Sequence, residues 1–202
     1  MCSSDLDLKQ VVLHLGNGAS ASAVVAGHAV DTSMGLTPLE GLVMGGRTGD
    51  IDPAAVFHLA RVAGMSIEEI DHLFNRSSGM KGLAGDNDMR EVWKRIDAGE
   101  QEAREAMDIY LHRLVKYVGA YTAVMGGLDA LTFTAGIGEN DANLRRELCE
   151  RLAYMGVEVD PELNGTRSDE PRVISTPDSK VTVLVVPTNE ELAIARQSLT
   201  LI

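Results

Sequence analysis

The residues best suited to chemistry lie in an irregular, glycine-rich stretch from residue 31 to residue 53, which contains a single cation, Arg47. Glycines flank this arginine closely, and because they lack a Cβ atom the backbone there can approach a ligand. A guanidinium in this setting suits a phosphoryl group in transfer, since its planar fork of N–H donors neutralises developing negative charge. The alternative is a surface loop in which Arg47 pairs with Asp50 or Asp52.

A second candidate lies where an apolar segment runs into a glycine-rich turn. Its residues are His14, Leu15, Gly16, Asn17 and Gly18. Backbone N–H groups in such a turn can hold a phosphate, and the Asn17 side chain adds a donor. The Asn-Gly pair is also a common hairpin signal, and His14 by itself is more often a core histidine than a catalyst. The local pattern leaves both interpretations open.

Two further segments carry polar residues next to turns. One follows an apolar segment and comprises Gly136, Ile137, Gly138, Glu139 and Asn140. It fits a turn that approaches a ligand, or a strand-to-helix turn with Asn140 or Asp141 as the helix N-cap. The other comprises Asp88, Met89 and Arg90, whose two charged residues could equally form a surface ion pair.

A pair of glutamates near the C-terminus could serve a cation. Thr188 and Glu191 have the spacing of a capping box, which would engage Glu191 at the start of the final helix. Glu190 would then be left to face a divalent cation or its waters. The alternative is that both glutamates only favour the positive end of that helix.

The elements that must position these residues begin with three short apolar segments. They span residues 8–15, 19–26 and 29–33, with turn signals at residues 16–18 and at Gly27 between them. This pattern predicts three consecutive strands joined by tight turns. We therefore expect an antiparallel meander that carries residues 14–18 at its first turn.

Helix signals follow the glycine-rich stretch. Asp52 and Pro53 predict an N-cap and a first helical residue, and the apolar pattern that follows ends at Gly64. Ser66 and Glu69 have capping-box spacing and predict a second helix directly afterwards.

The second half of the chain alternates helices and strands. Apolar residues recur at helical spacing over residues 101–125, which predicts one long amphipathic helix. Strands are expected over residues 128–134 and 181–186, with a helix over 144–155 between them and another from residue 189. This order predicts an α/β fold in which helices pack on the faces of a mixed sheet.

The overall composition excludes several classes of protein. Hydrophobic residues make up 45% and charged residues 24% of the 202 residues, as in globular domains. The net charge of −12 argues against nucleic acid or an anionic membrane as partner, but not against a nucleotide held by backbone N–H groups. No apolar run reaches the roughly 20 residues of a membrane helix, and no signal peptide is evident, so we expect a cytoplasmic protein. The two cysteines, Cys2 and Cys149, have no metal spacing.

Taken together, these motifs resemble the acetate kinases of the acetokinase family. Residues 31–53 are similar to the long signature of that family almost throughout, except that Gly46 stands where threonine is more common. The other blocks of the family follow in order at residues 14–18, 88–90, 133–140 and 187–191. The resemblance extends over roughly residues 8–198, whereas residues 1–7 match nothing in the family. We expect residues 1–7 to be an unrelated remnant and residues 8–202 to form the C-terminal nucleotide-binding domain.

The resemblance implies the fold of actin, the Hsp70 ATPase and the sugar kinases, which is a ribonuclease H-like domain. In such proteins two related domains close over ATP, and the nucleotide sits mainly on the C-terminal one. The resemblance also implies pairing into homodimers through this half. The acetate-binding arginine, the catalytic aspartate and a phosphoryl-contacting histidine of the family belong to upstream sequence, so we expect this chain to be incomplete and inactive by itself.

The resemblance also assigns roles to residues of this sequence. It implies that residues 14–18 contact the phosphates, that residues 88–90 line the nucleoside pocket, and that residues 136–140 form the adenosine-binding turn. Arg47 would stabilise the transferring phosphoryl group, and Glu190 would hold Mg²⁺ or Mn²⁺.

The expected reaction is transfer of a phosphoryl group from ATP to acetate, which yields ADP and acetyl phosphate. Two alternatives remain open at this point. One is a fragment of a kinase for propionate or another short-chain carboxylate. The other is a stand-alone, actin-like module that binds ATP or ADP without turnover.

Overall fold

A computed structural model describes residues 7–199, except for the side chains of residues 190–193. Within this part of the chain, six strands form one mixed sheet in the order β3-β2-β1-β4-β6-β5. The antiparallel meander predicted for the start of the chain is confirmed as β1 (Lys9–Leu15), β2 (Ala19–Val25) and β3 (His28–Thr32).

The other half of the sheet is mostly parallel. Strand β4 (Ala130–Thr134) pairs in parallel with β1 and with β6 (Thr182–Val185). The predicted bounds of both strands lie within two residues of these ends. The short edge strand β5 (Arg172–Val173), which pairs antiparallel with β6, was not predicted.

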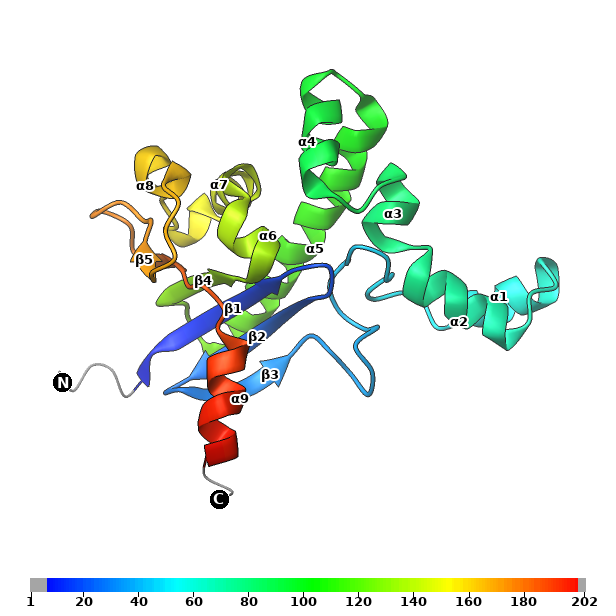
Figure 1. Cartoon of the computed structure of the whole chain (residues 1–202), viewed down its shortest axis with the longest axis horizontal. Coiled ribbons are helices and arrows are strands. Elements are labelled where there is room, and N and C mark those ends of the chain that lie inside the picture. The colour runs from blue at the N-terminus through cyan, green and yellow to red at the C-terminus, as the bar shows by residue number, and fades with distance from the viewer. Residues whose placement is uncertain (1–6, 200–202) are drawn as a thin grey trace.

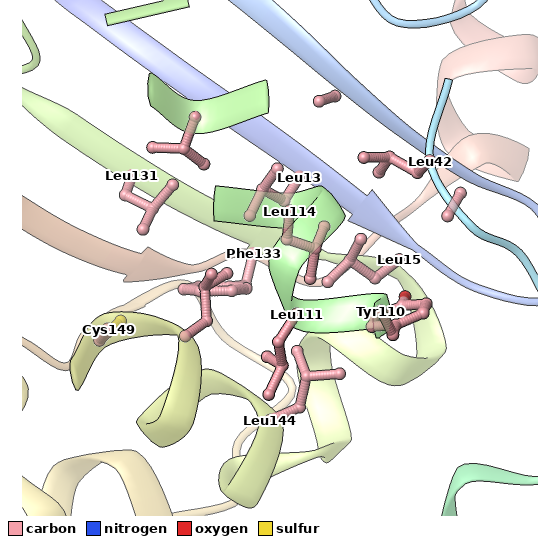
Figure 2. Packing of buried hydrophobic residues seen from close by; sticks show 14 of the residues in the cluster. Leu13, Leu15, Leu42, Tyr110, Leu111, Leu114, Leu131, Phe133, Leu144 and Cys149 are labelled. Atoms are coloured by element: carbon pink, nitrogen blue, oxygen red, sulfur yellow. The ribbon is translucent and has the colours of Figure 1, made fainter. Parts of the chain in front are cut away.

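The long helix predicted over residues 101–125 is confirmed as α5 (Gln101–Met125), and it packs against the sheet. Figure 2 shows Leu114 of α5 close to Leu13 and Leu15 of β1, with Leu111 of the same helix on the side of Leu144. These five side chains are almost fully buried. The alternation along β1 and the helical spacing along α5 therefore meet in one hydrophobic core.

Four helices precede α5. They are α1 (Ala54–Val62), α2 (Ile67–Arg76), α3 (Gly79–Ala84) and α4 (Met89–Asp97). In Figure 1, α1 and α2 project away from the sheet, and α1 has no buried residue. The capping box of Ser66 and Glu69 is confirmed at the start of α2. Helix α1 begins at Ala54, one residue later than predicted, and the Asp52 carboxylate accepts the N–H of Ala54, as the predicted cap would.

Two predictions for the region after β4 were wrong in detail. Residues 136–140 lie in a short helix, α6 (Ala135–Asn140), rather than in a turn, and the helix follows directly on β4 through Ala135, which has a φ of 66°. The helix predicted over 144–155 is α7 (Ala142–Arg151) followed by a 3-10 turn (Ala153–Met155), which ends at Gly156 with a φ of 84°. Helices α8 (Pro161–Gly165) and α9 (Glu190–Leu199) complete the chain.

Candidate functional site

The hairpin turn between β1 and β2 contacts the glycine-rich stretch that carries Arg47. The backbone N–H of Gly45 donates to the carbonyl of Asn17 over 2.9 Å. The approach is so close that a Cβ atom on Gly45 would lie 2.1 Å from Asn17 Oδ1. A Cβ atom on Gly18 would likewise lie 3.2 Å from Arg47 Nη1. The two segments that the sequence marked separately are therefore one structural unit.

The base of the Arg47 loop (residues 41–50) is closed by Asp50. Its carboxylate accepts the N–H of Gly41 at 2.8 Å, and its own N–H donates to the Gly41 carbonyl at 3.0 Å. From α5, Tyr117 Oη donates to Asp50 Oδ2 at 2.9 Å, and Arg113 lies 3.2 Å from the same oxygen. Burial and the bond to Asp50 raise the pKa of the Tyr117 phenol. These contacts fix the two ends of the loop to the core helix.

The Arg47 side chain is half-buried and forms no ion pair with Asp50 or Asp52, the two carboxylates that were candidates for pairing. Asp50 is engaged by Gly41 and α5, and Asp52 accepts the Ala54 N–H. The Arg47 guanidinium donates instead to the thioether of Met44, at 3.8 Å. In the part of the chain that the structure describes, this cation is thus directed toward the hairpin rather than neutralised.

A cavity of about 800 Å³ lies beside the hairpin. It is bounded by α4, by α6 and the start of α7, and by Arg167 from the segment after α8. Its lining residues are Asn17, Asn87, Asp88, Met89, Arg90, Trp93, Gly136, Ile137, Asn140, Asp141, Ala142, Asn143 and Arg167. Residues 88–90 therefore meet Gly136, Ile137 and Asn140, which are far from them in the sequence, at one hollow, whereas Gly138 and Glu139 do not line it.

The charged pair at the start of α4 borders this cavity. Arg90 Nη2 lies 2.6 Å from Asp88 Oδ2, so the expected alternative of a surface ion pair is observed. Asp88 also caps α4 by accepting the N–H of Arg90. Hydrogen bonds from Arg90 lower the pKa of the Asp88 carboxyl to about 2. The pair and the cavity lining are compatible, since both residues remain open to solvent.

Trp93, the one tryptophan of the chain, lies on α4, and its side chain contacts the start of α7. Its indole N–H donates to Asp141 Oδ2 at 2.7 Å, and Arg104 lies 5.8 Å from its ring centroid. Asp141 is also the N-cap of α7, where it accepts the N–H of Leu144. Of the two cap residues considered, Asp141 thus holds the position, while the Asn140 amide donates to the Gly136 carbonyl. Burial raises the pKa of the Asp141 carboxyl, although these donors oppose the rise.

Arg145, a buried arginine of α7, donates hydrogen bonds to backbone carbonyls of α6. Arg145 of α7 is 1% exposed and donates to the carbonyls of Gly138 and Glu139 at 2.8 and 2.9 Å. It also donates to the side chain and carbonyl of Asn164 in α8, at 2.8 and 2.7 Å. Burial lowers the pKa of this guanidinium to about 10, which still leaves it charged at neutral pH. Arg145 thereby fixes one wall of the larger cavity.

A second cavity of about 560 Å³ adjoins the first, and it is lined by cations and amides. Its lining residues are Asn17, Gly46, Arg47, Asp71, Asn75, Arg76, Lys81 and Asn87. Asn17 and Asn87 belong to both cavities, and the Asn87 amide donates to Asn17 Oδ1 at 3.1 Å. The two hollows therefore meet at this amide pair.

Some residues predicted for the site do not reach either cavity. Leu15 is fully buried in the core, so only its backbone could serve a ligand. His14 is half-buried on β1, opposite Ser20. Glu139 points to the segment before α9, where it accepts both the N–H and the hydroxyl of Thr188. Glu190 begins α9, but its side chain lies outside the described residues.

Other lining residues were not anticipated from the sequence. Trp93 follows Met89 at a spacing of one helical turn, which could have pointed to it once α4 was assigned. Arg76 and Lys81 reach their cavity through the junction of α2 and α3, and Arg167 through an irregular segment. No local pattern identifies these three.

Two absences concern only the residues that the structure describes. Among the side chains of residues 7–189 and 194–199, no group of three or more His, Cys, Asp or Glu could hold a metal ion. Over the same span, none of the helices has the length and apolarity needed to cross a membrane.

A family model and curated relatives both match this chain over most of its length. The family model described as the Acetokinase family matches residues 2–196. The chain is 61% identical over 193 residues to the acetate kinase of Leifsonia xyli, covering 96% of this chain and 49% of that protein. It is 60% identical over 196 residues to the acetate kinase of Streptomyces avermitilis, covering 97% and 48%. The chain thus spans about half the length of the curated relatives it matches.

Two solved kinase structures also match this chain over about half of their own length. The acetate kinase of Porphyromonas gingivalis superposes with a TM-score of 0.90 at 44% identity, covering 96% of this chain and 49% of that one. A propionate kinase from Francisella tularensis superposes with a TM-score of 0.87 at 44% identity, covering 94% and 48%.

Proposed function

The chain belongs to the acetokinase family, and we propose that it forms the nucleotide-binding part of an acetate kinase. It has the predicted α/β fold, which the acetate and propionate kinases share with actin and the sugar kinases. The proposed reaction is transfer of the terminal phosphoryl group of ATP to acetate.

One observation carries the proposal: the two cavities are contiguous and chemically different. The larger offers aromatic, apolar and amide groups, including Trp93 and Ile137, and suits a nucleoside. The smaller presents Arg47 and two other cations, and suits a phosphate chain. They join at Asn17, where the backbone N–H groups and small residues of the hairpin permit close approach of phosphate.

Arg47 would act on the phosphoryl group as it moves. Phosphoryl transfer needs an acceptor in line with the γ-phosphate and groups that neutralise charge spreading over its oxygens. Arg47 meets the second need, because its loop is fixed by Asp50 and its guanidinium faces the hairpin. Removing one such charge stabiliser typically lowers the rate on the order of a hundred- to a thousand-fold.

We further propose that Mg²⁺ arrives with the nucleotide and that Glu190 faces it. Mg²⁺ is commonly bound by one or two carboxylates together with phosphates and waters, so a cluster of three protein ligands is not required. Thr188, just before α9, is tied to Glu139 of α6 by two hydrogen bonds, which supports a position for Glu190 near the cavities. The ion would neutralise phosphate charge.

The resemblance assigns the acetate-binding arginine, the catalytic aspartate and a phosphoryl-contacting histidine to upstream sequence, and the chain spans about half the length of the relatives it matches. We therefore expect these 202 residues to bind Mg·ADP without producing acetyl phosphate. Calorimetry with Mg·ADP measures the first property, and a hydroxamate assay for acetyl phosphate measures the second. Absence of Mg·ADP binding would contradict the proposed function, whereas robust product would contradict the need for further sequence.

A kinase for propionate is the second candidate. The propionate kinase structure is as similar in sequence to this chain as the acetate kinase structure, at 44% identity. Selectivity between the two acids would depend on residues that contact the acyl chain. Comparing kcat/KM for acetate and propionate in the full-length protein decides between them.

We also propose that the protein is a cytoplasmic homodimer that pairs through α1 and the start of α2. Phe57, Val62 and Ile67 are 59%, 71% and 65% exposed there, on a helix pair that projects from the sheet. A cluster of exposed apolar side chains is typical of an interaction surface. Sedimentation of the chain and of Phe57→Asp tests this, with dimer expected for the first and monomer for the second.

A further inference from the structure

The smaller cavity contains two cations whose purpose the family signature does not explain. Arg76 ends α2 and Lys81 lies within α3, and both line the cavity together with Arg47. None of the three forms an ion pair with a carboxylate of the described residues. Three such cations around one hollow are notable in a chain with a net charge of −12.

Hydrogen bonds fix the backbone segments that carry these cations relative to one another. The segment from Phe74 to Lys81 is hydrogen-bonded to the Arg47 loop at four places. Thr48 N–H donates to the Phe74 carbonyl at 3.0 Å. The N–H groups of Ser78, Met80 and Lys81 donate to the carbonyls of Gly46, Met44 and Gly45 at 3.0, 2.9 and 2.9 Å. The junction of α2 and α3 and the Arg47 loop therefore form one rigid unit.

A glycine makes this arrangement possible. Gly79 has a φ of 60°, and a Cβ atom there would lie 2.2 Å from the Met44 carbonyl oxygen and 2.6 Å from that of Arg47. The Lys81 ammonium also donates to the Arg76 carbonyl, at 3.4 Å, so the ends of α2 and α3 are joined. The one acidic residue of the cavity lining, Asp71, accepts the Asn75 amide at 3.0 Å.

We propose that Arg76 and Lys81, with Arg47, bind the terminal phosphates of the nucleotide as a three-cation site. The proposal rests on the proposed function and assigns binding roles to two residues outside the recognised motifs. A phosphate chain entering from the shared pair Asn17 and Asn87 passes directly into this hollow. Because hydrogen bonds hold the backbone that carries these cations, only their side chains need to reorient when the anion binds.

The test is calorimetry on the 202-residue chain with four probes: adenosine, Mg·ADP, Mg·ATP and inorganic pyrophosphate. The variants are Arg76→Gln, Lys81→Met and the double variant. Lys116→Met serves as control, because Lys116 is an exposed lysine of α5 outside both cavities. A charge-assisted hydrogen bond corresponds to roughly tenfold in affinity. We expect each single variant to raise the Kd for Mg·ATP and for pyrophosphate by about that factor and to leave the Kd for adenosine unchanged. The Lys116→Met variant should bind all four probes with the Kd of the unmodified chain.

Each contrary outcome has a distinct meaning. If the variants match Lys116→Met with every probe, or weaken adenosine as much as Mg·ATP, the three-cation site is wrong. If the unmodified chain binds pyrophosphate through these residues but no adenosine nucleotide, the anion site stands and the proposed function fails. If the unmodified chain binds neither, both are overturned.

Discussion

The backbone N–H of Gly45 donates to the carbonyl of Asn17 over 2.9 Å, and this bond joins the hairpin turn to the Arg47 loop. A Cβ atom on Gly45 would lie 2.1 Å from Asn17 Oδ1 and 3.2 Å from the Asn17 carbonyl oxygen, so the Asn17 side chain would have to move. We therefore expect Gly45→Ala to destabilise the fold by about 1–3 kcal/mol, as overpacking does, and to weaken Mg·ADP binding. Urea denaturation and calorimetry measure the two effects.

Gly165→Ala is the matched control for this change. Gly165 ends α8, and a Cβ atom there would meet nothing within 4 Å. Its unfolding free energy should stay within about 0.5 kcal/mol of the unmodified chain, as for most surface substitutions. Equal behaviour of the two variants would show that the contact between Gly45 and Asn17 is not tight.

Gly79→Ala should separate the α2–α3 junction from the Arg47 loop. The substitution combines strain at a φ of 60° with a Cβ atom 2.2 Å from the Met44 carbonyl oxygen. Gly85→Ala introduces similar strain, at a φ of 75°, but its Cβ atom would meet nothing within 4 Å. We expect about 1–2 kcal/mol of destabilisation for Gly85→Ala and clearly more for Gly79→Ala in urea denaturation. A similar loss for both would mean that the loop accommodates the added methyl group.

The sequence predicted the parts of the fold whose side chains follow a simple period. Strand β1 alternates buried and half-buried residues, and α5 buries residues at three- and four-residue steps. Turn and cap chemistry located the hairpin at Gly16 to Gly18 and the start of α2. Periodicity and capping are local properties, so a single sequence reveals them.

Adjacent arginines of α7 show where this approach fails. Arg145 is 1% exposed and Arg146 is exposed, yet both stand in the same polar run. The positions of α6 and α8 decide which of them is buried, because acceptors in both helices bind Arg145. Local sequence also fails to predict that Arg76 and Lys81 line the smaller cavity. Hydrogen bonds between the α2–α3 junction and the Arg47 loop bring them there.

Arg145→Met should therefore be strongly destabilising. The methionine fills similar space but leaves the carbonyls of Gly138 and Glu139 and the Asn164 side chain without their donor. Leaving buried polar groups unsatisfied costs about 3 kcal/mol or more in such networks. Urea denaturation should show this loss, and Mg·ADP affinity should fall because the wall formed by α6 is released.

The neighbouring substitution Arg146→Met provides the comparison. Arg146 is solvent-exposed and pairs with Glu150 at 3.1 Å on the surface of α7. Exposed pairs of this kind contribute about 0–1 kcal/mol. If Arg145→Met and Arg146→Met have equal unfolding free energies, Arg145 does not hold the wall of the larger cavity that α6 forms.

Tyr117→Phe should loosen the base of the Arg47 loop. It removes the hydroxyl that donates to Asp50 at 2.9 Å, while Gly41 and Arg113 still hold that carboxylate. We expect a loss of about 1 kcal/mol in stability and faster hydrogen exchange at the amides of Gly41 and Asp50. Tyr154→Phe, at a residue 74% exposed, should change neither. Unchanged exchange in Tyr117→Phe would show that the loop base does not depend on α5.

The hydrogen bond from Trp93 to Asp141 predicts a pH-dependent fluorescence signal. Burial raises the pKa of Asp141 above its ordinary value of 3.8. A raised folded-state pKa means that the folded chain holds this proton more tightly than the unfolded chain. Ionised Asp141 therefore lowers stability above its folded pKa, and this cost fades as the pH falls to 3.8.

Because Trp93 is the sole tryptophan, its emission reports this one carboxyl group. We expect a fluorescence transition with a midpoint above pH 3.8, while circular dichroism shows that the chain remains folded. Asp141→Asn should lack the transition but stay folded, since the asparagine carbonyl oxygen still caps α7 by accepting the N–H of Leu144, although its NH2 group replaces the oxygen that accepts from Trp93. A midpoint at or below 3.8, or a transition that persists in Asp141→Asn, would assign the signal to another group.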